Sequence, residues 1–345
     1  MEIRAIGIDL RKSMFHLVAV DARGQVLERR KLSRVKLLQY TGTLRSCLIG
    51  MEAGAGGHYL GRRLLAQGHD VRLMPAQYVR PYVKSSHKND TLDAEGIVEA
   101  VQRPTMRFVP LKTPEQLDLQ ALHRVRDRLV ARRTSVINQL RAFLFERGIT
   151  IRQGRRHLEE QLPQILEDAD NDLSARMRAL LRGLQEEWKT LEADIARVEE
   201  EIERLAAHDD ACQRLAEIPG VGPLVATALV AAVGNATSFA KGRDLAAWLG
   251  LVPRQSSTGG RTRLLGISKR GNPYVRRLLI LGAHSVLISP RRERHGFGRW
   301  LLALQPRAHP NVVVVALANK LARIASAVLT RQERYRTTLL AGVSA

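Results

Sequence analysis

The sequence predicts an α/β amino-terminal domain over residues 1–110, a helical coiled-coil linker for oligomerisation over 111–208, and a mainly α-helical carboxyl-terminal domain over 209–345. Short apolar runs that alternate with helical patterns predict the first domain. A heptad repeat of apolar residues predicts the second. A Pro-Gly-Val-Gly turn between two helical patterns, followed by a basic stretch, marks the third.

The amino-terminal third alternates strand and helix patterns. Strands are expected at 2–9, 14–21, 25–32, 47–52 and 70–75, and helices near 36–46, at 58–67 and from residue 90 onward. The tight turn at 22–24 favours an antiparallel meander for the first three strands. The later strands are separated by helices, which predicts parallel crossover units.

Four carboxylates fall at the ends of these elements. Asp9 and Glu52 end the first and fourth strands, and Asp90 and Asp93 begin the last helix. A spacing of three places both aspartates on one helix face. Any one of these acids alone is explained by a turn or a helix cap. Because all four converge despite their repulsion, we expect Asp9, Glu52, Asp90 and Asp93 to bind a pair of Mg²⁺ ions.

Two long helical patterns occupy the middle of the chain. The second has apolar residues at the spacings 3, 4, 3, 4, 3 of a heptad seam, namely Trp188, Leu191, Ile195, Val198, Ile202 and Leu205. The first pattern, over 117–147, is rich in arginine and poor in acids, and therefore predicts a phosphate-binding surface that includes Arg124, Arg128, Arg132 and Arg133. An ordinary solvated helix face is the alternative. Periodicity leaves open whether the two helices form a hairpin or a dimer seam.

The turn at 219–222 lies between two helical patterns, as in a helix-hairpin-helix. Gly220 and Gly222 would allow backbone N–H groups to approach a phosphate at a helix amino terminus. The alternative is a helical turn that uses glycine and proline for its geometry.

The segment from Leu245 to Arg292 contains no acid. Within it, the hydroxyl-rich stretch Ser-Ser-Thr-Gly-Gly at 256–260 is expected to be a flexible loop between arginines. On physical grounds alone it suits phosphate binding, because a nucleophilic serine needs an activating base or metal and no histidine is nearby in the sequence. Nucleic-acid contacts are expected from Arg254, Arg261, Arg263, Lys269 and Arg270.

The overall charge agrees with a polyanionic partner. Among 345 residues, 55 Lys and Arg oppose 34 Asp and Glu, a net charge of +21, which favours nucleic acid over a membrane surface. Cys47 and Cys212 lie in apolar segments and are expected to be buried free thiols. The amino terminus has no signal-peptide pattern, and the longest uncharged apolar run, 224–234, is too short to span a bilayer. A cytoplasmic protein is expected.

Five motifs together resemble the transposases of the insertion-sequence family numbered one hundred and ten, in its branch numbered eleven hundred and eleven. They are GIDLRKSMFHLVAVD, GMEAGAGGHY, KNDTLDAEGIVEA, IPGVGPLVATAL and the segment that begins GLVPRQSSTGG. The resemblance covers nearly the whole chain. It implies an RNase H-like (RuvC-like) first domain whose DEDD metal site is Asp9, Glu52, Asp90 and Asp93. After Glu52 this chain has AGAGG where relatives commonly have a Cys-Gly or Thr-Gly step.

The resemblance also implies a serine nucleophile that forms a covalent link to DNA. The family pattern points to Ser257, two residues before the Gly-Gly pair, with Ser256 as second choice and Thr258 as third. It further implies a composite active site shared between subunits of a dimer or tetramer. A structured non-coding guide RNA would choose the DNA by base pairing. The expected activity is transposition by metal-assisted strand cleavage and transfer.

Three other functions are weighed against this one. A RuvC-like nuclease would hydrolyse branched DNA without a covalent intermediate. A non-catalytic nucleic-acid-binding protein would use the acids only structurally. An actin-like sugar kinase also begins with an IGIDL strand and a hairpin, but a later Asp-Gly-Gly phosphate loop is missing and the charge of +21 disfavours it.

Overall fold

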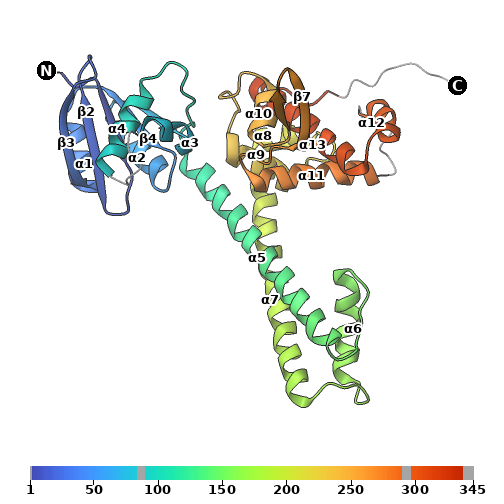
Figure 1. Cartoon of the computed structure of the whole chain (residues 1–345). Coiled ribbons are helices and arrows are strands. Elements are labelled where there is room, and N and C mark those ends of the chain that lie inside the picture. Colours follow the sequence, from blue (N-terminus) through green and yellow to red (C-terminus); the bar gives the residue numbers. More distant parts are fainter. Residues whose placement is uncertain (1, 84–89, 290–296, 337–345) are drawn as a thin grey trace. The chain divides into compact units, whose positions relative to one another are not determined.

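The structure is a computed structural model that describes residues 2–83, 90–289 and 297–336. The chain divides into two compact units, Met1–Pro114 and Glu115–Ala345, and each has its own buried core. Figure 1 shows the chain coloured from blue to red along the sequence. The expected division into three domains, with boundaries at residues 110 and 208, stays a prediction.

The described part of the first unit is a five-stranded sheet with helices on both faces. Its elements are β1 (Ala5–Asp9), β2 (Met14–Val20), β3 (Val26–Ser33), α1 (Arg34–Gly42), β4 (Leu48–Glu52), α2 (Gly57–Ala66), β5 (Asp70–Met74), α3 (Ala76–Val79), the 3-10 turn η1 (Arg80–Tyr82) and α4 (Asp90–Val101). The strand order is β3-β2-β1-β4-β5. The predicted antiparallel meander and the two parallel crossovers are confirmed.

The central strand β1 is covered on both faces, because its side chains alternate between two apolar layers. Ile6 and Ile8 join the cluster that includes Leu37 of α1 and Leu60 of α2. On the opposite face, Ala5 joins a cluster with residues of α4. The helix α4 therefore packs on the face of β1 that also carries residues 7 and 9.

Two glycines let α4 lie directly on the sheet. Gly7 and Gly50 are register partners on β1 and β4. A Cβ at Gly7 would collide with the Ala94 carbonyl and lie 2.6 Å from the Val98 nitrogen, and a Cβ at Gly50 would lie 2.7 Å from Val101 Cβ. Only glycine leaves space for this approach of helix backbone to strand backbone.

The second unit is helical except for one described hairpin. It contains α5 (Pro114–Phe145), α6 (Arg155–Glu167), α7 (Ala175–Ala207), α8 (Asp210–Ala216), α9 (Pro223–Val233), α10 (Gly242–Trp248), β6 (Pro253–Thr258), β7 (Arg261–Ile267), α11 (Pro273–Ile288), α12 (Gly298–Leu304), the 3-10 turn η3 (Gln305–Arg307) and α13 (Pro310–Arg331). The described residues after 208 are mainly helical. The expected loop at 256–260 is wrong, since residues 256–258 end strand β6.

The long helices α5 and α7 pack antiparallel within the chain (Figure 1). Arg126 pairs with Glu199 at 2.7 Å and Arg133 with Glu192 at 3.3 Å, so that rising numbers on α5 meet falling numbers on α7. The apolar seam of α7 is largely buried against α5 and α6. The hairpin alternative therefore describes this pair, and a dimer seam stays a prediction.

A buried hydrogen-bonded triad ties α5 to two helices of the carboxyl-terminal part. His123 is 3% exposed, and its two ring nitrogens lie 3.0 Å from the hydroxyls of Thr227 on α9 and Tyr274 on α11. Thr227 donates its own proton to the Pro223 carbonyl at 2.7 Å. The imidazole Nε2 must then donate to Thr227, and Nδ1 accepts from Tyr274. Both ring nitrogens of a neutral His123 side chain therefore have a hydrogen-bond partner.

The helix α13 forms the centre of the second core. By length and composition it is, among the described helices, the one that could cross a membrane, and its hydropathy is 1.8. Ten of its residues are buried within the unit. Lys320 and Arg323 interrupt the apolar run of α13, so that no long uncharged run marks this helix in the sequence. Both cysteines are free and buried, as predicted, and burial raises the pKa of Cys47 to about 11.

Replacing Gly7 by alanine should destabilise the first unit by about 1–3 kcal/mol, because the added methyl group overpacks the contact with α4. Thermal or urea unfolding of the variant measures this loss. Gly54→Ala is a matched control, since its Cβ would meet no described atom within 4 Å. Equal stability of the two variants would show that α4 does not approach β1 this closely.

Stability of the second unit should fall as the pH drops from 6.5 to about 4. Burial, and secondarily Arg126, lowers the pKa of His123 to about 4. Between these two pH values the unfolded chain binds a proton that the folded chain does not. The free energy of unfolding therefore falls by up to about 3 kcal/mol. Urea unfolding at several pH values measures the change. His123→Gln should flatten the profile, whereas replacement of the exposed His208 should leave it unchanged.

Candidate functional site

Three of the four predicted acids meet at the carboxyl end of β1. One carboxylate oxygen each from Asp9, Asp90 and Asp93 lies within 4.8 Å of the others. The side chains of Asp9 and Asp90 are 15% and 32% exposed, so that the cluster is open to solvent on one side. The sheet register explains the convergence, because Asp9 follows Gly7 by two residues and points to the face that α4 covers.

Glu52 occupies the equivalent position on the neighbouring strand. It follows Gly50 by two residues at the carboxyl end of β4 and therefore points to the same face. Burial raises its pKa, and the nearby charges of Asp9 and Asp93 raise it further. The Glu52 carboxylate thus lies within the electrostatic field of the cluster, although it is outside the 4.8 Å group.

Two basic side chains that the sequence analysis did not select border the acids. Arg11 donates from Nη2 to Asp90 Oδ1 and from Nε to Asp9 Oδ2 at 3.3 Å. His16 Nε2 lies 3.6 Å from Asp90 Oδ2. The predicted meander could have found His16, because Asp9 and His16 are register partners on β1 and β2. Arg11 is only two residues from Asp9 but gives no periodic signal.

The donor set fits a hard divalent cation. Every candidate ligand atom is a carboxylate oxygen, which is the donor type that Mg²⁺ prefers. The Arg11 guanidinium supplies the positive charge between Asp9 and Asp90 in this structure. The site thus already attracts a cation, and a metal ion would compete with Arg11 for the same oxygens.

The predicted nucleophile lies on a hairpin that is exposed on both faces. Residues 256–258 of β6 pair with 261–263 of β7 across the turn Gly259–Gly260. Both turn residues have positive φ, 56° and 76°, as the two central positions of a type I′ turn require. The Ser257 hydroxyl accepts from Gln255 Nε2 at 2.8 Å and lies 3.4 Å from the Thr262 hydroxyl.

The two serines face opposite sides of this hairpin. Ser257 is opposite Thr262, whereas Ser256 is opposite Arg263 and Thr258 is opposite Arg261. Side-chain alternation therefore places Arg261 and Arg263 on the side of Ser256. Arg254 is also exposed on β6. Lys269 and Arg270 follow β7 with exposed side chains, and Lys269 adopts a left-handed φ of 55°.

The predicted arginine surface on α5 is partly occupied by acids. Arg132 pairs with Glu187 at 2.9 Å, and Arg133 with Glu192. The premise that too few acids are available to pair with these arginines is wrong, because the acids of α7 lie opposite. Within the described part of the chain, Arg124 and Arg128 are exposed and have no ion pair. A nucleic-acid role for all four stays a prediction.

The glycines of the 219–222 turn differ in their surroundings. Gly220 has a φ of 85°, and its Cβ would lie 2.6 Å from the Gly282 carbonyl oxygen of α11. Gly222 is exposed at the start of α9. Packing and turn geometry thus account for Gly220, whereas Gly222 is exposed, and a phosphate contact at either glycine stays a prediction.

Comparison with known proteins assigns the class. Residues 212–296 match the Transposase IS116/IS110/IS902 family, and residues 6–147 match a transposase family of the DEDD type of IS110. The acid cluster falls in the second of these regions and the serine hairpin in the first. The chain is a transposase, that is, a DNA recombinase, and its DEDD family implies the use of a divalent metal.

Three relatives are similar over nearly their full lengths. A probable family 20 transposase of Pseudomonas aeruginosa is 46% identical over 97% of this chain and 99% of its own. The transposase for insertion sequence element IS1111A of Coxiella burnetii is 44% identical over 97% and 92%. The transposase for IS1328 of Yersinia enterocolitica is 41% identical over 95% and 97%. The chain belongs to the IS110/IS116/IS902 family of insertion-sequence transposases.

Replacing Arg11 by alanine should lower the melting temperature in metal-free buffer, because the acids then lose their internal counterion. Mg²⁺ binding should strengthen by up to about fivefold, the equivalent of the ~1 kcal/mol of a partly exposed ion pair. Calorimetric titration and melting curves with and without Mg²⁺ measure both effects. Arg45→Ala removes a highly exposed ion pair with Glu2 and serves as the control. Unchanged Mg²⁺ affinity in the Arg11 variant would contradict the competition.

Proposed function

We propose that this transposase excises and inserts its own insertion sequence, with Ser257 as the nucleophile and with Mg²⁺ held by Asp9, Glu52, Asp90 and Asp93. The observation that carries the proposal is the convergence of three carboxylate oxygens within 4.8 Å. The raised pKa of Glu52, which burial and the charges of Asp9 and Asp93 cause, supports its membership of the same site.

The first unit has an RNase H-like fold of the RuvC type in this proposal. Its strand order β3-β2-β1-β4-β5, with an antiparallel meander followed by two parallel strands, supports that assignment. The position of the acids also supports it, since they lie at the carboxyl ends of adjacent strands and at the start of the helix that covers them. The division into three domains, with a coiled-coil linker for oligomerisation, is part of the same proposal.

The acids hold and orient the cation in this mechanism. When bound, Mg²⁺ supplies positive charge to the phosphate under attack and to the oxygen that leaves. Asp9 and Glu52 extend from rigid strands, and Asp90 and Asp93 from the first turn of α4, so that the sheet and the helix set the positions of all four carboxylates. Arg11 now pairs with Asp9 and Asp90, and a cation held by these acids would leave its guanidinium available to a phosphate oxygen.

The serine performs the covalent step. Ser257 Oγ forms a bond to phosphorus while the bond from phosphorus to one deoxyribose oxygen breaks. That oxygen leaves as a hydroxyl with the proton that the serine gives up. A hydroxyl of a second strand then attacks the phosphoserine and releases Ser257 with its proton restored. The two steps are balanced, and no water is consumed.

The surroundings of Ser257 require outside activation. Its described hydrogen-bond neighbours are Gln255 and Thr262, neither of which is a base. A lone serine hydroxyl is a weak nucleophile without a base or metal. This supports a composite site in which acids and serine meet across subunits of a dimer or tetramer.

The partners follow from the charge and the family. DNA is the substrate of a transposase, and a structured guide RNA is proposed as a second partner that chooses the target. The proposed nucleic-acid contacts are Arg124, Arg128, Arg132, Arg133, Gly220, Gly222, Arg254, Arg261, Arg263, Lys269 and Arg270. The net charge of +21 supports extensive phosphate contact. The protein is proposed to act in the cytoplasm.

The same lack of a base near Ser257 favours one alternative. A RuvC-like nuclease would use metal-activated water on branched DNA, and the hairpin would only bind phosphate. This enzyme would release free 5′-phosphate ends and form no protein–DNA adduct.

Replacing Ser257 by alanine should abolish covalent adducts with end-labelled element DNA and leave DNA binding within about twofold. Ser256→Ala is the matched control, because it removes the neighbouring hydroxyl on the opposite face, and its adducts should persist. Denaturing gels after protease treatment detect the adducts. Persistent adducts in the Ser257 variant would refute the assignment. Asp9→Asn should in parallel reduce strand cleavage by at least about a hundredfold, equivalent to ~2.7 kcal/mol in the barrier.

A further inference from the structure

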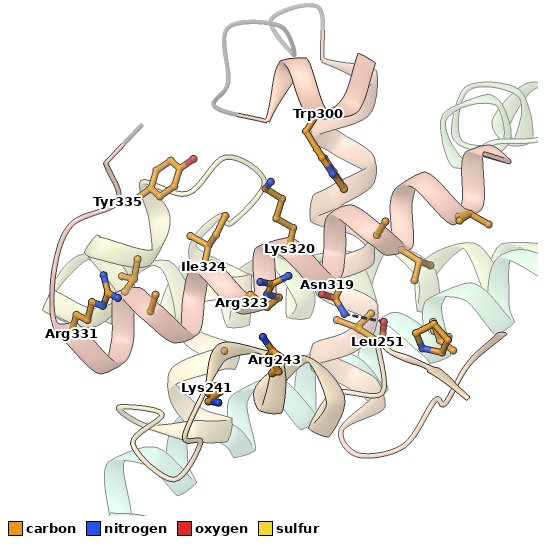
Figure 2. A pocket seen from close by; sticks show the side chains of 18 of the residues that line it. Lys241, Arg243, Leu251, Trp300, Asn319, Lys320, Arg323, Ile324, Arg331 and Tyr335 are labelled. Atoms are coloured by element: carbon orange, nitrogen blue, oxygen red, sulfur yellow. Dashed lines mark hydrogen bonds between the residues drawn. The ribbon is translucent and has the colours of Figure 1, made fainter. Parts of the chain in front are cut away.

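The second unit contains a cleft of about 1380 Å³ that the proposed mechanism does not use. It lies between α10, α13, α12 and the base of the β6–β7 hairpin, and Figure 2 shows its side chains. We propose that this cleft binds an unpaired stretch of DNA and guides that strand to the hairpin of Ser257. The second half of this inference rests on the proposed role of Ser257.

The lining is strongly basic. Seven of its side chains are lysine or arginine, and one is acidic, Glu333. Among the described residues, no ion pair engages Lys241, Arg243, Arg323 or Arg331, which Figure 2 labels on α13 and at the start of α10. Cations gathered without acids repel one another and attract a polyanion.

The interior of the cleft is apolar and aromatic. Val312, Val315 and Ile324 of α13 line it with Leu251. Trp300 of α12 and Tyr335 lie at its edges (Figure 2), and the Lys320 ammonium is 4.7 Å from the Trp300 ring centroid. A surface that bound only phosphates would not need these apolar and aromatic side chains. Aromatic faces beside cations suit unpaired bases, which stack on side chains while phosphates meet lysine and arginine.

The lining does not suit the bases of a duplex. In a duplex the base faces are stacked on the neighbouring base pairs, and only the base edges and the backbone are exposed, so that a paired base cannot stack on Trp300. A single strand can enter with its bases toward the apolar floor. At one side of the cleft, Gly242 lets the start of α10 lie directly against α13. A Cβ at Gly242 would lie only 2.9 Å from the Arg323 carbonyl oxygen, so that glycine is what allows Arg243 to lie this close to α13.

The cleft leads toward the proposed nucleophile. Pro253 of β6 and Ile267 of β7 line it and are register partners at the base of the hairpin. Ser257 lies four residues further along β6, or about 13 Å at the usual rise of a strand. A strand that leaves the cleft along the hairpin therefore passes the Ser257 hydroxyl.

Fluorescence anisotropy with labelled ten-nucleotide probes tests the assignment in the Ser257→Ala background, in which the proposed mechanism allows no cleavage. The probes are a DNA single strand, its duplex and the RNA of the same sequence. The double variant Arg243→Ala/Arg323→Ala should bind the DNA single strand about tenfold more weakly. Its slope of log affinity against log salt should fall by about 1.4, since two phosphate contacts are lost.

The matched control is Arg176→Ala/Arg182→Ala, which removes two exposed arginines of α7 outside the cleft. It should retain single-strand binding within about twofold. Trp300→Ala should weaken binding by about tenfold through lost stacking, with the salt slope unchanged. This variant keeps the test decisive if the arginine pair fails to fold, as melting curves would reveal.

An equal loss of single-strand affinity in the two double variants would show that only the overall charge matters, and it would overturn the proposal. So would duplex binding that depends equally on the cleft, or tighter binding of the RNA. Adduct formation with Ser257 restored separates the two claims. Adducts without cleft-dependent binding would remove only the cleft proposal, whereas cleft-dependent binding without adducts would remove only the serine mechanism.

Discussion

The contact between α4 and the sheet is the constraint on which the acid site depends. Gly7 and Gly50 sit side by side on β1 and β4, and each leaves the space of a missing Cβ to α4. The next residues on the same face are Asp9 and Glu52, and the helix begins with Asp90. The close approach of α4 to β1 and β4 thus brings the four carboxylates together, because the alternation of the strands and the position of the helix leave the acids little freedom to separate.

Electrostatics explains how a chain with a net charge of +21 tolerates this acidic cluster. The first unit supplies an internal cation, Arg11, and in the second unit arginines of α5 pair with glutamates of the antiparallel helix α7. The positive charge that remains without partners lies partly in the cleft beside α13. Negative charge is therefore concentrated at the proposed metal site, and unpaired positive charge at the proposed nucleic-acid cleft.

The sequence predicted those parts of the structure that local patterns encode. The strands of the first unit follow from apolar runs and turn residues, and the acids were found because they end those elements. The β6–β7 hairpin was missed because both its faces are exposed and no apolar alternation marks it. Arg11 contacts Asp90 across 79 positions, and Arg132 meets Glu187 through helix register, so that neither contact has a local signal. The cleft likewise combines elements far apart in the chain.

The turn at Gly259–Gly260 has a consequence for the surroundings of Ser257. A strand with one buried face is held in register by its buried apolar side chains, but neither strand of this hairpin has a buried face. The length of the glycine turn then sets which residue of β7 lies opposite each serine. A turn lengthened by one residue would shift β7 against β6 and replace Thr262 as the cross-strand neighbour of Ser257, so that the surroundings of this hydroxyl depend on the two glycines beside it.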